Sequence, residues 1–297
     1  MKEIIEALFN AGFTIWDNCI TVSRGLFESS PKDHDMWSIV QGIYTTVKAG
    51  AIPLATLFFI IALYKTVVSS PPEQALKKFL SDGIRYGLIL FVIDKLDEII
   101  VAIMKYADAF VKSVHVGTFS SLRNSQSTAI LITRIESIDL DLSTVNAMDF
   151  GGTIETFFEQ IGPFILFFIA GVITILVLAS SGITVIGIAY QRIIKPLAMI
   201  PLSTVILSMS CCSDEGTKTM WSMGKTFLGL CLSGGLFIIA IHMGYSIGDK
   251  LAEIAPALSE GRDWESAIII VVRANIGAVI TTGLLKSMDA MIQKAFG

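Results

Sequence analysis

The chain has 297 residues, of which 53% are hydrophobic and 16% are charged, and its mean hydropathy is +0.69. A soluble domain carries roughly 25% charged residues, so this composition excludes an ordinary soluble protein and indicates a membrane protein. The formal net charge of -4 is small, which argues against a basic surface that binds nucleic acid.

Residues 1–48 are predicted to form two amphipathic helices outside the membrane. Residues 29–31, Ser-Ser-Pro, mark the boundary between the two helices, because Ser and Pro are typical of helix ends. Trp16, Trp37 and Tyr44 are expected at the depth of the lipid headgroups, which amphipathic aromatic side chains prefer.

Five stretches are predicted to cross the membrane as helices. The strongest is 162–189, which has no charged side chain and exceeds the roughly 20 apolar residues that a spanning helix needs. The other four are 49–64, the stretch that begins near Phe79, 226–248 and 266–285.

Charge in the connecting segments predicts the orientation, because Lys and Arg are retained on the cytoplasmic side. Three basic segments are therefore expected inside; their charged residues are Lys65, Lys77, Lys78 and Arg85, then Arg192, Lys195, Lys218 and Lys225, and finally Lys286 and Lys294. The longer segment 104–161 and the acidic segment 249–265 are expected outside. The sequence thus predicts an all-α, polytopic protein with about five spans, an external N-terminus and a cytoplasmic C-terminus.

Residues 193–209 are apolar but contain Pro196 and Pro201, each of which removes a backbone donor and bends or breaks a helix. A broken or re-entrant element that packs against protein fits the charge distribution. A sixth plain span is the alternative, although it would place the basic C-terminus outside.

Four regions follow from this topology. They are an external N-terminal region at 1–48, two spans with a basic cytoplasmic loop at 49–103, a large external loop at 104–161 and a C-terminal membrane bundle at 162–297. The helix of the second span is expected to continue past its charged cluster, because apolar residues return at helical spacing from Ile99 onward.

Arg273 lies in the middle of an apolar stretch, where an ionisable side chain is costly and a functional role is the default hypothesis. It either pairs with a carboxylate such as Asp94 or Glu98, caps broken backbone of another helix, or faces a water-lined cavity or a pore. The charged cluster that follows the second span could line the same path, relay protons or bind a cation, although a solvated helix end is the simpler explanation. That cluster consists of Asp94, Lys95, Asp97 and Glu98.

Glycine pairs four residues apart let helices approach closely in membranes. Two such pairs, Gly83 with Gly87 and Gly244 with Gly248, are predicted to pack helices. The sequence has no phosphate-binding glycine loop, no catalytic Ser-His-Asp set and no metal-ligand cluster. We therefore expect neither an enzyme nor a cofactor, and the four cysteines are expected to be packing thiols.

The order of these elements resembles the TrbL-type polytopic subunit of conjugative type IV secretion systems, the family of the sixth VirB protein. The resemblance is strongest from Tyr190 to about Gly248, in the basic residues, the PLAMIPLS segment, the short polar loop and the Gly-rich helix that follows.

The resemblance implies a multicopy channel and scaffold component of the bacterial cytoplasmic membrane. Its expected partners are further copies of itself in a ring, pilin, secretion ATPases, the lipid bilayer, and DNA or protein in transit. The alternative is a secondary transporter or channel that acts alone and binds an anionic substrate through Arg273.

Overall fold

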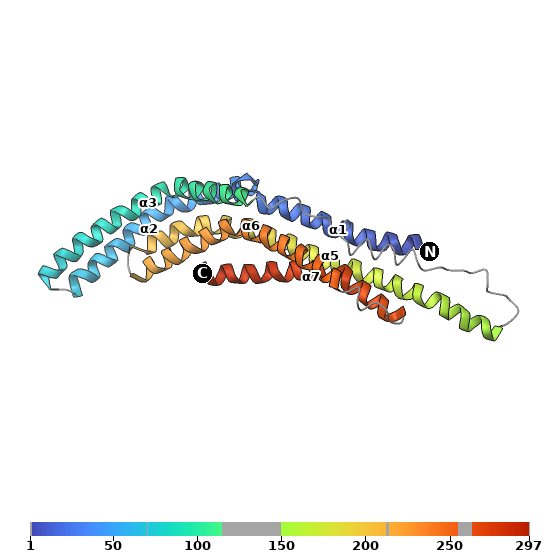
Figure 1. Cartoon of the computed structure of the whole chain (residues 1–297). Helices are drawn as coiled ribbons and strands as arrows, with labels where there is room; N and C mark the ends of the chain where they lie inside the picture. The colour runs from blue at the N-terminus through green and yellow to red at the C-terminus, as the bar shows by residue number, and fades with distance from the viewer. Residues whose placement is uncertain (1, 70, 115–149, 212–213, 255–262, 297) are drawn as a thin grey trace. The chain divides into compact units, whose positions relative to one another are not determined.

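The computed structural model describes residues 2–69, 71–114, 150–211, 214–254 and 263–296 (Figure 1). In these residues the chain forms six α-helices and one short 3-10 helix, and no strand. The elements are α1 (Lys2–Glu28), η1 (Pro31–Asp33), α2 (Met36–Ser69), α3 (Pro72–Ser113), α5 (Phe150–Met209), α6 (Asp214–Ile254) and α7 (Asp263–Phe296). The all-α prediction is therefore confirmed for this part of the chain, and the predicted boundary at 29–31 separates α1 from α2.

Two compact units make up the chain, and neither is continuous in sequence. Unit 1 comprises Met1–Arg24, Val116–Ile188 and Ile238–Ser287; unit 2 comprises Gly25–His115, Ala189–Phe237 and Met288–Gly297. Each unit combines segments from both halves of the chain, and the four regions predicted from the membrane topology stay a prediction.

Unit 1 is built on the apolar face of α1. Five large side chains, spaced three or four residues apart, are buried along this face: Ile5, Phe9, Phe13, Trp16 and Ile20. Glycine at 182 of α5 makes room for the Cys19 side chain, since a Cβ there would lie 2.7 Å from the Cys19 sulfur. The indole Nε1 of Trp16 donates a hydrogen bond to the Tyr245 hydroxyl at 2.7 Å. Trp16 is thus fully enclosed by protein, and its predicted depth at the lipid headgroups stays a prediction.

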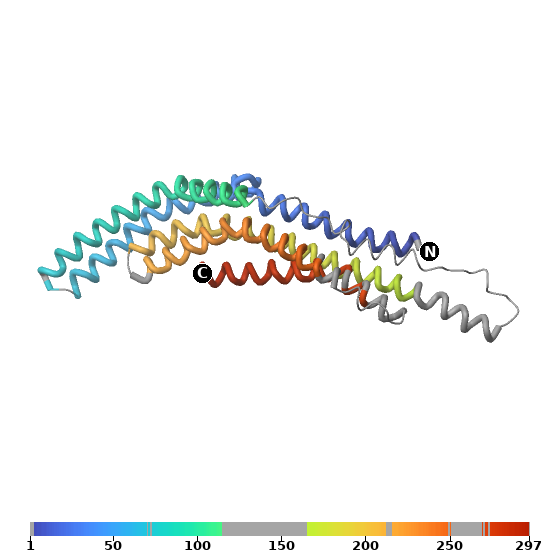
Figure 2. The backbone as a smooth tube through the Cα atoms, viewed as in Figure 1, coloured from blue at the N-terminus to red at the C-terminus, as the bar shows by residue number. Residues whose placement is uncertain are grey.

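In unit 2, α2 and α3 lie side by side, and the chain reverses between them (Figure 2). One stripe of α3 is buried at helical spacing, from Ile89 and Ile93 through Ile100 to Val111. It packs in one core with residues of α5 and α6. This stripe continues past the charged cluster, which confirms that the helix extends beyond the second predicted span.

The predicted break at Pro196 and Pro201 is wrong, because α5 is continuous through both prolines. One face of this stretch is buried by Ile193, Leu197 and Ile200, while Leu202 on the opposite face is exposed. Packing along the buried face holds the helix although each proline removes one backbone hydrogen bond. The part of the prediction that placed 193–209 against protein agrees with this burial.

Three helices in the described residues are long and apolar enough to cross a membrane. They contain the stretches Met36–Ser69, Ile165–Met209 and Gly216–Gly248. These stretches include three of the five predicted spans. The spans predicted in α3 and α7 do not reach the same length and apolarity in the described residues, so the count of five stays a prediction.

Candidate functional site

A buried arginine in unit 2 is the most unusual polar group in the described part of the chain. Arg192 of α5 is 4% exposed, and apolar helix flanks it on both sides. A charged side chain without water requires polar partners, because burial removes its hydration.

The partners of Arg192 are backbone carbonyl oxygens at the C-terminal end of α1. Its Nη1 donates to the carbonyl oxygens of Leu26 at 3.0 Å, of Phe27, and of Ser29 at 3.3 Å. The last carbonyl groups of a helix have no partner within the helix and carry partial negative charge. Arg192 therefore caps α1 from a distant part of the sequence, where the last turn of α1 has no basic residue of its own.

A second helix contributes to the same site. Arg192 Nη2 donates to the carbonyl oxygen of Cys231 in α6 at 3.4 Å. A Cβ added at Gly234, one turn later, would collide with the guanidinium, so glycine makes room for the charge. Beside it, the rings of Phe27 and Phe237 lie 5.1 Å apart and close the site with apolar surface.

The glycine next in sequence makes room on a different face of α6. A Cβ at Gly235 would lie 3.0 Å from the ring of Phe110 and 3.2 Å from Val114, both near the end of α3. The Gly234-Gly235 pair thus allows α6 to contact the arginine on one side and α3 on the other.

The end of α3 also carries a carboxylate that attracts this charge. Asp108 interacts electrostatically with Arg192, and it accepts a hydrogen bond from Lys112 at 2.8 Å. That hydrogen bond and the charge of Asp108 raise the pKa of Lys112 above its ordinary value. The guanidinium is therefore stabilised by backbone carbonyl groups and by one more distant carboxylate. Nη1 and Nη2 both donate hydrogen bonds to the protein, and these bonds connect α5 to α1 and α6.

Arg192 was predicted only as one of the basic residues of a cytoplasmic segment, and its burial was missed. The burial of Arg192 could have been predicted from its position in the sequence. Apolar residues continue on both sides of it, so the charge lies inside one long apolar helix. Its partners carry no such signal, because any residue supplies a backbone carbonyl.

The predicted charged cluster lies on α3 and pairs locally. Lys48 of α2 donates to the backbone oxygen of Asp94 at 2.6 Å and lies 3.4 Å from the carboxylate of Asp97, while Lys95 pairs with Glu98 at 2.6 Å. These side chains are mostly half-buried or exposed, an environment in which ion pairs contribute little to stability. The cluster is an ion-paired helix surface, and its role in a pore stays a prediction.

Arg273 lies in α7, but its side chain is outside the part of the chain that the structure describes. The core of the large predicted loop, 115–149, is outside it as well. The role of Arg273 and the external position of this loop therefore stay predictions.

The two glycine pairs behave differently. A Cβ at Gly244 would collide with Thr281, and a Cβ at Gly248 would lie 2.7 Å from the Cα of Gly277, so α6 and α7 approach closely there. A Cβ at Gly83 or Gly87 would meet no atom within 4 Å. The pair Gly244 and Gly248 packs helices within unit 1, whereas Gly83 and Gly87 contact no other helix of the described residues.

No group of His, Cys, Asp and Glu in the described residues could hold a metal ion. Comparison with family models, with curated proteins and with solved structures finds no match. The resemblance to the TrbL-type subunit therefore gains no support from these comparisons.

Proposed function

We propose that the chain is a channel or scaffold subunit in the cytoplasmic membrane of a type IV secretion machine used for conjugation. The order of its elements supports this role: an amphipathic N-terminal helix, a first span-length helix, a long third helix with lysines near the junction of the two, and a long apolar helix that runs through Pro196 and Pro201.

The observation that carries the proposal is the apolar surface that single helices leave uncovered. Within one chain, only 22% of the most apolar 18-residue stretch of α2 is buried. The buried share of the corresponding stretch is 39% in Ile165–Met209 and 67% in Gly216–Gly248. Residues such as Ile60 in α2 and Leu176 in α5 are more than half exposed. Lipid and neighbouring copies of the chain would cover this surface in a membrane-embedded ring.

Five spans with an external N-terminus and a cytoplasmic C-terminus are part of the same proposal. In a cysteine-free background, a single cysteine in Ser125→Cys should react with a membrane-impermeant reagent added from outside. The matched variant Gly297→Cys should react only after lysis. The reverse pattern would contradict the orientation.

Partners of the chain in this role are pilin, the secretion ATPases, further copies of itself, and DNA or protein in transit. Affinity isolation at native expression from native membranes tests this set directly. We expect a homo-oligomer accompanied by secretion ATPases. A monomer isolated without any secretion subunit would contradict the proposal and favour a transporter or channel that acts alone.

A further inference from the structure

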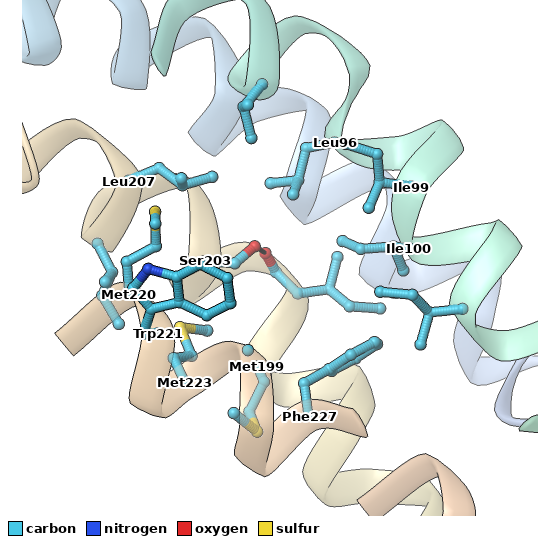
Figure 3. Close-up of a pocket in the computed structure, with 15 residues that line it drawn as sticks. Leu96, Ile99, Ile100, Met199, Ser203, Leu207, Met220, Trp221, Met223 and Phe227 are labelled. Atoms are coloured by element: carbon cyan, nitrogen blue, oxygen red, sulfur yellow. Dashed lines mark hydrogen bonds between the residues drawn. The ribbon is translucent and has the colours of Figure 1, made fainter. Parts of the chain in front are cut away.

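An apolar pocket of about 370 Å³ opens in unit 2 between α3, α5 and α6 (Figure 3). Side chains of α3, including Leu96 and Ile100, face Met199 and Phe227 across it. Ser203 brings a hydroxyl group to this lining, and that hydroxyl donates to the carbonyl oxygen of Ile200 within its own helix. The pocket therefore suits a purely apolar occupant of the size that small-ligand sites accept.

A second pocket, of about 530 Å³, adjoins the first through a shared residue. Trp221 lines both pockets. The second pocket is basic, because Lys218 and Lys225 of α6 and Lys294 of α7 line it. Among the described residues no carboxylate pairs with these three lysines.

Contacts between α6 and α7 fix the basic pocket. The Thr226 hydroxyl donates to the carbonyl oxygen of Phe296 at 2.8 Å, and a Cβ at Gly229 would overlap the Phe296 ring. The end of α7 is thereby held against α6, which places Lys294 on the same pocket as Lys218 and Lys225.

We propose that unit 2 binds one anionic phospholipid, with an acyl chain in the apolar pocket and the phosphate group at the three lysines. The apolar pocket complements an acyl chain, and the adjoining cationic pocket complements the anionic phosphate group of the same lipid. Trp221 stands between them and is 65% exposed, as aromatic residues at the membrane interface commonly are. Basic pockets between membrane helices are the sites that bind acidic headgroups.

A protein segment or a free anion fits these observations less well. A protein helix in the apolar pocket would leave the three lysines without a counter-charge. A free phosphate ion would leave the apolar lining uncovered. The two helices that line the apolar pocket beside α3 are the span-capable parts of α5 and α6, so lipid of a surrounding bilayer would have access to the pocket. This binding site does not depend on the proposed role in secretion.

Two variants test the two halves of the site separately. Lys218→Gln, Lys225→Gln and Lys294→Gln together remove the cationic half, and all three side chains are exposed. Gly224→Leu fills the apolar half, since Gly224 lines the pocket and a Cβ there meets no atom within 4 Å. The matched controls are Lys65→Gln with Lys77→Gln and Lys78→Gln, and Gly87→Leu, which is equally unobstructed.

The measurement is native mass spectrometry of the full-length chain, purified in detergent and titrated with phosphatidylglycerol or phosphatidylcholine of the same acyl chains. We expect one phosphatidylglycerol per chain, held at least about tenfold more tightly than phosphatidylcholine, because each lysine contributes severalfold to the affinity for an acidic headgroup. The triple lysine variant should abolish this preference, and Gly224→Leu should weaken both lipids. Neither control should change binding.

Three results would overturn the proposal. Equal affinity for the two lipids would remove the role of the lysines. Displacement of the lipid by inorganic phosphate at similar concentrations would show a site for a free anion. Unchanged lipid binding in Gly224→Leu, together with a changed oligomeric state, would show that protein fills the apolar pocket.

Discussion

The guanidinium of Arg192 in α5 occupies the space that a side chain at Gly234 of α6 would need. This relationship makes two positions interdependent that are far apart in sequence. It also explains why a charged residue is accommodated within an apolar helix: the neighbouring helix leaves room for it, and α1 supplies the carbonyl oxygens.

Gly234→Ala should destabilise the protein by about 1–3 kcal/mol, since even one methyl group forces the guanidinium from its site. Thermal unfolding of the detergent-purified chain, followed by circular dichroism, measures this loss. Gly224→Ala on the same helix is the matched control, because its Cβ would meet no atom and alanine favours helix. Equal melting temperatures for the two variants would contradict the packing described at Gly234.

Arg192→Met should free the C-terminal end of α1. The substitution leaves the carbonyl oxygens of Phe27 and Ser29 without their guanidinium donor, at about 1–3 kcal/mol for each buried group. Arg192→Lys should cost less, because one ammonium group retains the charge but not the planar fork.

Limited trypsin digestion reads out this loosening, because Lys32 lies in η1 directly after the capped helix. We expect faster cleavage at Lys32 in Arg192→Met than in the wild type, with Arg192→Lys between them. The exposed substitution Lys105→Met serves as a control. Cleavage at an unchanged rate in Arg192→Met would show that the cap does not stabilise this junction.

The contact of α6 with α7 predicts a contrast between two glycines. Gly248→Val should lower the unfolding temperature, because the new side chain would push against the backbone of Gly277. Gly87→Val places the same side chain on an exposed position of α3 and should change the unfolding temperature much less. A smaller effect at Gly248 than at Gly87 would contradict the close approach of the two helices.

Arg273 tests the proposed path for substrate. Arg273→Leu should preserve membrane insertion but reduce substrate transfer, because a hydrated path or an inter-subunit carboxylate would lose its charged partner. Arg273→Lys should be milder, since charge and hydration remain. Full transfer by Arg273→Leu, with an intact oligomer on native gels, would remove Arg273 from the mechanism.

The sequence predicts local features of this fold well and distant ones poorly. The continuation of α3 beyond Asp94 was predictable because apolar spacing along one helix is a local signal. The continuity of α5 through Pro196 was not, because it depends on burial of one helix face by other helices. Gly83 and Gly248 belong to identical glycine spacings, yet only Gly248 meets another helix, since spacing does not encode what lies opposite.

The candidate site shows the same limit. The predicted residues Asp94 and Asp97 pair with Lys48, a partner from the preceding helix that spacing within α3 does not reveal. Arg192 binds backbone oxygens, whose positions follow from the fold and not from residue type. Arg273 remains a prediction from its apolar sequence context.

A mating assay tests the proposed role of the chain as a membrane subunit of a conjugation machine. The gene for the chain is deleted from a donor strain of its native host, and the transfer frequency of a mobilisable plasmid is measured with and without complementation by the wild-type chain. We expect transfer to fall to the level of a strain without the secretion ATPase and to return on complementation. Undiminished transfer by the deletion strain would contradict it.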